Sequence, residues 1–143
     1  MRFLLTLLIA LFAVMASGSH QVRCAGRAIA APVNGLADCV TYLRWVADGV
    51  LWSPGPKPPK EHTLGPNSCE PVVCIHGAQV RWCNDDTKNP RTMKVVHMAE
   101  GANVLLHECQ DTWKGERVAG GVLSHPDKWS LVVQSHEDCR PGH

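Results

Sequence analysis

The sequence predicts an α+β fold, a two-layer sandwich in which one antiparallel sheet of about four strands carries two helices on one face. Two stretches with helical spacing of apolar residues alternate with two pairs of short β-rich runs. Seven cysteines are spread over these elements, which indicates that disulfides cross-link them. The order helix, two strands, helix, two strands places both hairpins in one sheet.

The N-terminal residues 1–18 are typical of a secretory signal peptide. Arg2 precedes an apolar run over residues 3–16, which is shorter than the roughly 20 residues that a membrane-spanning helix needs. Cleavage is expected after Ala16 or Gly18. We expect residues 19–33 to form an N-terminal segment, 34–139 a single disulfide-rich domain and 140–143 a tail, and the protein to be secreted.

The charge balance argues against two classes of partner. The chain has 14 Lys and Arg against 13 Asp and Glu, and Arg2 is the only charge in the expected signal, so the remainder is neutral. A neutral chain without a basic block selects neither nucleic acid nor an anionic membrane. We therefore expect no nucleic acid partner, no membrane anchor and a monomer. The eight histidines would add positive charge below about pH 6.

The first expected helix follows residue 34 and ends at Gly49. Asn34 or Gly35 can cap it. Its apolar positions fall on one face: Leu36, Cys39, Val40, Leu43, Val46 and Ala47. Residues 53–66 contain five prolines and predict a loop of polyproline character, either a recognition loop or, the interpretation we favour, a tolerant surface insertion.

A β-hairpin is expected at 71–76 and 78–83, with Gly77 in the turn. Ala78, Val80 and Trp82 share the face that we expect to be buried.

The second expected helix follows Asn89-Pro90 and ends near Cys109. Its apolar positions recur every three or four residues: Val95, Met98, Ala102, Leu105 and Cys109. A second hairpin is expected at 117–123 and 129–134, with a bulge or bend at Gly120-Gly121.

The cysteines predict a disulfide network and leave its connectivity open. The disulfide candidates are Cys39, Cys69, Cys74, Cys83, Cys109 and Cys139. Cys24 is the candidate for the unpaired cysteine, because it lies in the segment with the least pattern. No C-x-x-C spacing occurs, so we expect neither a metal site nor a cofactor.

Several of these features together resemble one group of proteins. Cys69-Glu70-Pro71-Val72-Val73-Cys74, Arg81-Trp82-Cys83-Asn84-Asp85, a helix ending in Cys109 and Gly120-Gly121-Val122 before Cys139 form the pattern. It resembles small secreted cysteine-rich effector-like proteins of filamentous ascomycete fungi. The resemblance implies a sandwich similar to some virally encoded killer toxins and action at the interface with a host or a competitor. It carries over no binding residue.

Catalytic motifs are absent from the sequence. Gly-x-Ser-x-Gly does not occur, and His107-Glu108 does not continue to the His-Glu-x-x-His motif. His136-Glu137-Asp138 is interpreted as a polar C-terminus and Asp85-Asp86 as turn residues. We therefore predict no catalytic residue.

Tryptophan provides the candidate binding surface. Trp113, in the polar loop 110–116, and Trp52, at the start of the proline-rich loop, are the candidates; Trp82 and Trp129 are expected in the core. The leading hypothesis is a non-enzymatic, effector-like protein that binds a host or competitor protein or a cell-wall glycan, outside cells or after uptake. The alternatives are a killer-toxin-like antimicrobial protein and a small secreted hydrolase or protease inhibitor.

Overall fold

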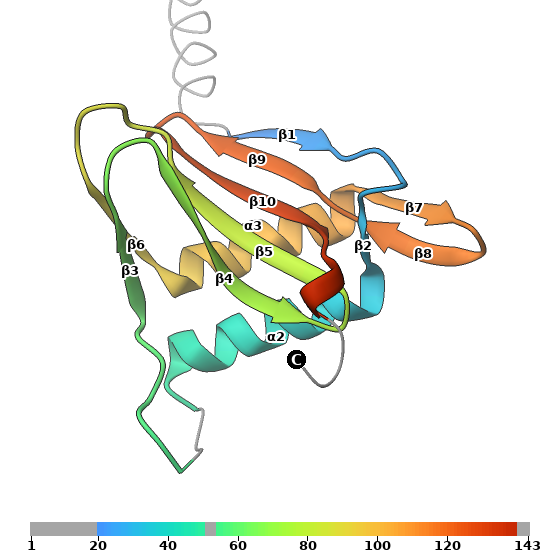
Figure 1. The fold of residues 1–143 in the computed structure, drawn as a ribbon, viewed down its shortest axis with the longest axis horizontal. Coiled ribbons are helices and arrows are strands. Elements are labelled where there is room, and N and C mark those ends of the chain that lie inside the picture. Colours follow the sequence, from blue (N-terminus) through green and yellow to red (C-terminus); the bar gives the residue numbers. More distant parts are fainter. Residues whose placement is uncertain (1–19, 51–53, 140–143) are drawn as a thin grey trace, which may run out of the picture.

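The structure, a computed structural model, describes residues 20–50 and 54–139 (Figure 1). Within these ranges ten strands form three sheets, accompanied by two α-helices and a short 3₁₀-helix. The predicted fold class, a two-layer sandwich with a single antiparallel sheet of about four strands, is therefore wrong. The expected signal peptide (1–18), Trp52 and the tail (140–143) lie outside the described residues.

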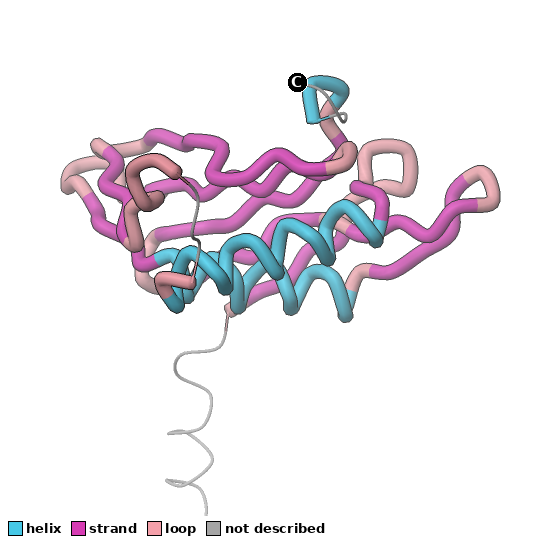
Figure 2. Tube along the Cα trace, turned by 90° about the horizontal axis from the view of Figure 1, so that it is seen from below, coloured by secondary structure: helices cyan, strands magenta, loops and turns pink. Residues whose placement is uncertain are grey.

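The main sheet has five antiparallel strands. Their order across the sheet is β1 (Gln21–Cys24), β9 (Gly121–His125), β10 (Trp129–Ser135), β5 (Ala78–Asn84) and β4 (Ser68–Ile75). The expected first hairpin is present as β4 and β5, with the turn at His76-Gly77. Helices α2 (Val33–Asp48) and α3 (Val95–Glu108) lie side by side along one face of this sheet (Figures 1 and 2).

Two small sheets were not predicted. One contains β2 (Ala31–Pro32), β8 (Glu116–Ala119) and β7 (Gln110–Trp113), and the other pairs β3 (Glu61–Leu64) with β6 (Arg91–Lys94). Each of these strands has two to four residues, which is too few to show an alternating pattern. Strand β3 lies inside the expected 53–66 loop, which is thus structured at its C-terminal end.

Gly121 explains why the second expected hairpin is divided between two sheets. The chain leaves β8 at Ala119 and enters β9 at Gly121, which has a φ of 152°. A Cβ at Gly121 would lie 2.3 Å from the carbonyl oxygen of Arg23 in the neighbouring strand. Only glycine allows β1 to approach this closely, so the expected bend is the point where the chain changes sheets.

The core fills the space between the main sheet and the two helices. The apolar faces predicted for the helices are buried there, together with the inward side chains of β5, β9 and β10. Trp82 is the largest fully buried side chain. The 3₁₀-helix η1 (Glu137–Cys139) closes the described C-terminal end, where the Gly77 backbone N–H donates to the Cys139 carbonyl at 2.7 Å.

Candidate functional site

Six of the seven cysteines form three disulfides, so the expected network is present, but one assignment is wrong. The pairs are Cys24–Cys109, Cys69–Cys83 and Cys74–Cys139. Cys24, the candidate for the unpaired cysteine, is bonded, and Cys39, a disulfide candidate, is free. The reason is β1, which was not predicted: its pairing with β9 brings Cys24 to the C-terminal end of α3.

The free cysteine is buried in the core. Cys39 has an exposed fraction of 0% on the inner face of α2, and its thiol donates to the Ala78 carbonyl, with 3.6 Å between sulfur and oxygen. Burial disfavours the thiolate and raises the pKa of Cys39 to about 11. Because the thiolate is the reactive form, this side chain is unsuited to be a nucleophile.

Cys39 is therefore expected to resist alkylation. At pH 8, iodoacetamide should leave the native protein unlabelled, and in denaturant without reductant it should label one cysteine, Cys39. Mass spectrometry of the two samples measures this. Labelling of Cys39 in the native protein at the rate of an exposed thiol would contradict the burial described for it.

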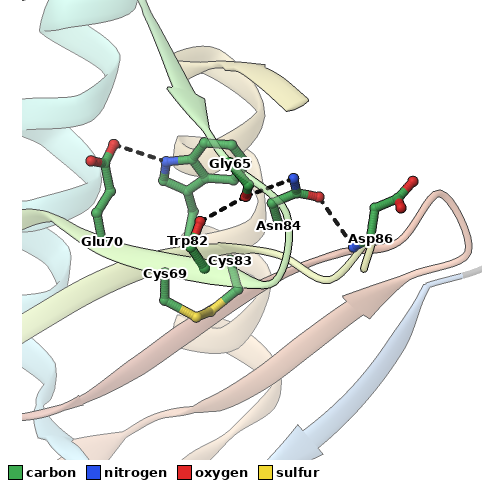
Figure 3. Close-up of a disulfide and its surroundings, with 8 residues drawn as sticks. Gly65, Cys69, Glu70, Trp82, Cys83, Asn84 and Asp86 are labelled. Atoms are coloured by element: carbon green, nitrogen blue, oxygen red, sulfur yellow. Dashed lines mark hydrogen bonds between the residues drawn. A yellow bond between two sulfur atoms is a disulfide. The ribbon is translucent and has the colours of Figure 1, made fainter. Parts of the chain in front are cut away.

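The Trp-Cys-Asn-Asp element of the sequence, residues 82–85, holds neighbouring segments together through hydrogen bonds and a disulfide (Figure 3). Beside the Cys69–Cys83 disulfide, the indole Nε1 of Trp82 donates to Oε1 of Glu70 at 3.2 Å. The Asn84 side-chain amide donates to the Gly65 carbonyl at 3.0 Å. Asn84 is almost fully buried, so this element ties the 65–68 turn to β5.

Asp86 continues this network into the next turn. Its backbone N–H donates to the Asn84 side-chain oxygen at 3.1 Å, and its carboxylate accepts the backbone N–H groups of Lys88 and Asn89 at 2.9 and 3.1 Å. These hydrogen bonds, that from Lys88 first, lower the pKa of Asp86. Asp86 therefore stabilises the turn that follows β5, as expected from the sequence.

The β7–β8 hairpin extends away from the main sheet (Figure 1). Its two strands pair from Gln110 opposite Ala119 to Trp113 opposite Glu116. The two-residue turn contains Lys114 and Gly115, both with positive φ, 50° and 80°. This is the conformation of a type I′ turn, whose twist matches that of the strands. Trp113 thus occupies the last strand position before the tip.

Three contacts anchor the base of the hairpin. The Cys24–Cys109 disulfide lies immediately before β7. On the other strand, Val118 and Ala119 are buried and pair with β2. The Arg27 guanidinium forms an ion pair with the Asp111 carboxylate, with 3.1 Å between Nε and Oδ2. The hairpin is consequently fixed to the body at its base while its tip is exposed.

The tip presents one aromatic ring among charged side chains. Trp113 has an exposed fraction of 39%, and Nζ of Lys114 lies 5.6 Å from its ring centroid, within the range of a cation–π contact. Glu116 and Arg117 are also exposed. An amphipathic ring held in place among polar neighbours is typical of an energetically dominant contact in protein interfaces.

The other tryptophans are placed differently. Trp82 is in the core, as expected, while Trp129 is partly buried and stacks on His125, with ring centroids 4.9 Å apart. Trp45 on α2 is half exposed, at 50%. The pairing of Arg27 with Asp111 of the hairpin was not predicted, because the two residues lie far apart in the chain and no local pattern joins them.

The described residues also bear on metal binding and membrane spans. Within 20–50 and 54–139, no three His, Cys, Asp or Glu side chains are grouped as a metal site. His136 and Asp138 of the polar C-terminal cluster lie 3.8 Å apart. Neither described helix combines the length and apolar character needed to cross a bilayer.

Comparisons with known proteins found no similarity. No protein-family model, no curated protein and no solved structure matches this chain.

Proposed function

We propose that this chain is a secreted, disulfide-stabilised binding protein that acts without catalysis on a target at the surface of a host or competitor cell. The observation that carries this proposal is the β7–β8 hairpin, which holds the exposed ring of Trp113 away from the body on a covalently anchored base. The hairpin is the proposed contact surface.

The disulfides support an extracellular site of action. Three disulfides in a chain of this size persist in oxidising compartments such as the secretory pathway and the extracellular space. The signal peptide expected at residues 1–18 agrees with this destination. We therefore propose that the target lies outside the cell that makes the protein.

The anchoring of the hairpin supports binding in energetic terms. Association has a cost for ordering flexible side chains and loops. Here the turn, the strand pairing and the Cys24–Cys109 bond order the segment before any partner arrives. A tryptophan presented in this way contributes on the order of 2 kcal/mol when a partner buries it.

Direct binding to cells tests the proposal. The mature, oxidised protein carries a fluorescent label at its N-terminus and is titrated onto candidate host cells and competing microorganisms, with unlabelled protein as competitor. We expect saturable, competed binding to one class of cell, which the reduced and alkylated protein does not reproduce. Growth inhibition of the microorganisms would identify the target as a competitor. Absence of saturable binding to either class would contradict the proposal.

A further inference from the structure

The two edges of the main sheet differ in how they are protected. Strand β4, at one edge, contains Pro71, which has no backbone N–H, and its register with β5 is irregular between Pro71 and Val73. Proline and bulges prevent a further strand from pairing with an edge. Strand β1, at the other edge, has the sequence Gln-Val-Arg-Cys and pairs with β9 in regular register. It carries neither device, so its outer edge can accept a further strand.

Strand β1 is held rigidly at the margin of the sheet (Figure 1). Val22 packs against the core, and the Cys24–Cys109 disulfide joins the last residue of the strand to the end of α3. Among the described residues, β9 is the only strand that pairs with β1. The backbone N–H and C=O groups of alternate residues therefore point away from the sheet without a strand partner. Because β1 is already ordered, a partner strand does not have to order it.

The face of the main sheet turned away from α2 and α3, which we call the open face, carries positive charge. Trp82 of β5 points into the core, so its neighbour Arg81 points to the open face (Figure 2). Residues paired in antiparallel register share a face, and the pairing runs from Arg81 across β10 and β9 to Arg23 of β1. Arg23 and Arg81 are the only charged residues at the described strand positions of this face.

Carboxylates of the described chain do not neutralise these two arginines. The ion pairs within 20–50 and 54–139 all join other residues. Glu137 and Asp138 of η1 lie beside β4, at the far edge from β1, and Glu100 and Glu108 belong to α3, on the other side of the sheet. Arg23 is exposed, so an acidic side chain of a partner can reach its guanidinium group.

A hollow of about 440 Å³ lies beside Arg23. Its lining comes from β1 and β9 and contains a single charged residue: Gln21, Val22, Arg23, Val122 and Ser124. Side chains of a strand alternate between the two faces of a sheet, so every second side chain of a strand added to β1 would lie on the open face, next to this hollow. A carboxylate at such a position can accept two hydrogen bonds from the guanidinium group.

We propose that the outer edge of β1 binds an extended acidic segment of a partner protein, which adds to the five-stranded main sheet as a sixth strand. Backbone hydrogen bonds to β1 hold the segment, and carboxylates at every second position meet Arg23. A second copy of the chain is a poorer occupant, because it would bring further arginines to the open face. The inference goes beyond the function proposed for the hairpin, since it requires neither Trp113 nor a cell surface.

Fluorescence polarisation with labelled peptides of about six residues, the usual length of a strand, tests the proposal. The probe alternates glutamate with threonine, the first control has glutamine in place of glutamate, and the second control is the probe with N-methylated backbone nitrogens. We expect the oxidised protein to bind the probe about fivefold or more tightly than the glutamine peptide and not to bind the methylated peptide, which cannot pair with a strand. Equal binding of either control, or no binding of the probe, would overturn the proposal.

Matched variants assign the charge preference to Arg23. Arg23→Gln should weaken binding of the acidic probe by about fivefold and leave binding of the glutamine peptide unchanged, which shows that the edge itself is intact. Arg44→Gln removes an exposed arginine of α2, on the other side of the sheet, and should leave binding of the probe within about twofold of wild type. Trp113→Ala should have no effect. Wild-type affinity of Arg23→Gln for the acidic probe would contradict the role of this residue.

Two measurements locate the bound peptide and exclude a second copy. Hydrogen exchange of the backbone N–H groups of β1 should become slower when the acidic probe binds, and protection confined to other segments would rule out strand addition at this edge. Sedimentation of the protein without peptide should show a monomer. A dimer that the acidic probe dissociates would make a second copy the occupant of the edge and would overturn the proposal.

Discussion

Replacing both Cys24 and Cys109 by serine should lower the free energy of unfolding by about 4.5 kcal/mol. The disulfide closes a loop with a sequence separation of 85 residues, and in the chain-entropy picture such a loop restricts the unfolded state strongly. The bond also joins the edge strand β1 to the end of α3 and the base of the β7–β8 hairpin. Its loss should therefore loosen the hairpin as well as the fold.

The Cys69–Cys83 pair provides the matched control. Its sequence separation is 14 residues, so its removal should have the smaller effect, about 3 kcal/mol. Urea unfolding of the oxidised proteins, followed by circular dichroism, measures both changes. The role assigned to the long loop would be wrong if the Cys24→Ser, Cys109→Ser double variant unfolded at the wild-type midpoint. It would also be wrong if removal of the Cys69–Cys83 bond lowered the free energy of unfolding by more than removal of Cys24–Cys109.

Trp82→Ala should destabilise the protein by about 3 to 5 kcal/mol. Trp82 on β5 is fully buried in the core between the main sheet and the helices. The substitution leaves a large cavity and removes the indole N–H that donates to Glu70. Among the described residues, the Glu70 carboxylate then keeps its contact with His62, with 3.0 Å between Oε1 and the imidazole Nδ1.

Two further variants separate packing from hydrogen bonding at Trp82. Trp82→Phe keeps much of the ring volume and loses the donor, so it should lie between wild type and alanine. Trp129→Ala removes a ring that is only partly buried and should cost less than Trp82→Ala. Thermal and urea unfolding of the three variants measure their loss of stability. An equal loss for Trp82→Ala and Trp129→Ala would contradict the greater burial of Trp82.

Elements in which buried apolar residues recur at a regular spacing over many positions were predictable from the sequence. The helical spacing from Leu36 to Val46 and from Val95 to Leu105 matches the buried faces of α2 and α3. Ala78, Val80 and Trp82 of β5 are buried as predicted, but Gln79 and Cys83 on the opposite face are buried too, so the expected alternation is only half right. In the two helices, burial of one face imposes a repeat on the sequence that can be recognised locally.

Elements defined by their partners were not predictable. Strand β1 has four residues, of which three are exposed, and only its pairing with β9 makes it a strand. The assignment of Cys24 failed for the same reason, since the position of its partner depends on that pairing. Strand β3 follows several prolines and exists through its contact with β6, which local composition does not report.

The candidate binding surface likewise has one part that the sequence predicts and one part that it does not. Trp113 could be named from a polar, glycine-containing loop between a helix and a strand. Its anchoring could not, because Arg27, Cys24 and β2 reach the hairpin from the other end of the chain.

The most direct test of the hairpin as the contact surface compares two exposed tryptophans. Trp113→Ala and Trp45→Ala each remove a ring with substantial exposure, from the hairpin and from α2, and neither should change stability by more than about 0.5 kcal/mol. Titration onto the cells that bind the wild-type protein should show an affinity about tenfold or more weaker for Trp113→Ala and near the wild-type value for Trp45→Ala. Wild-type affinity in Trp113→Ala would contradict the account.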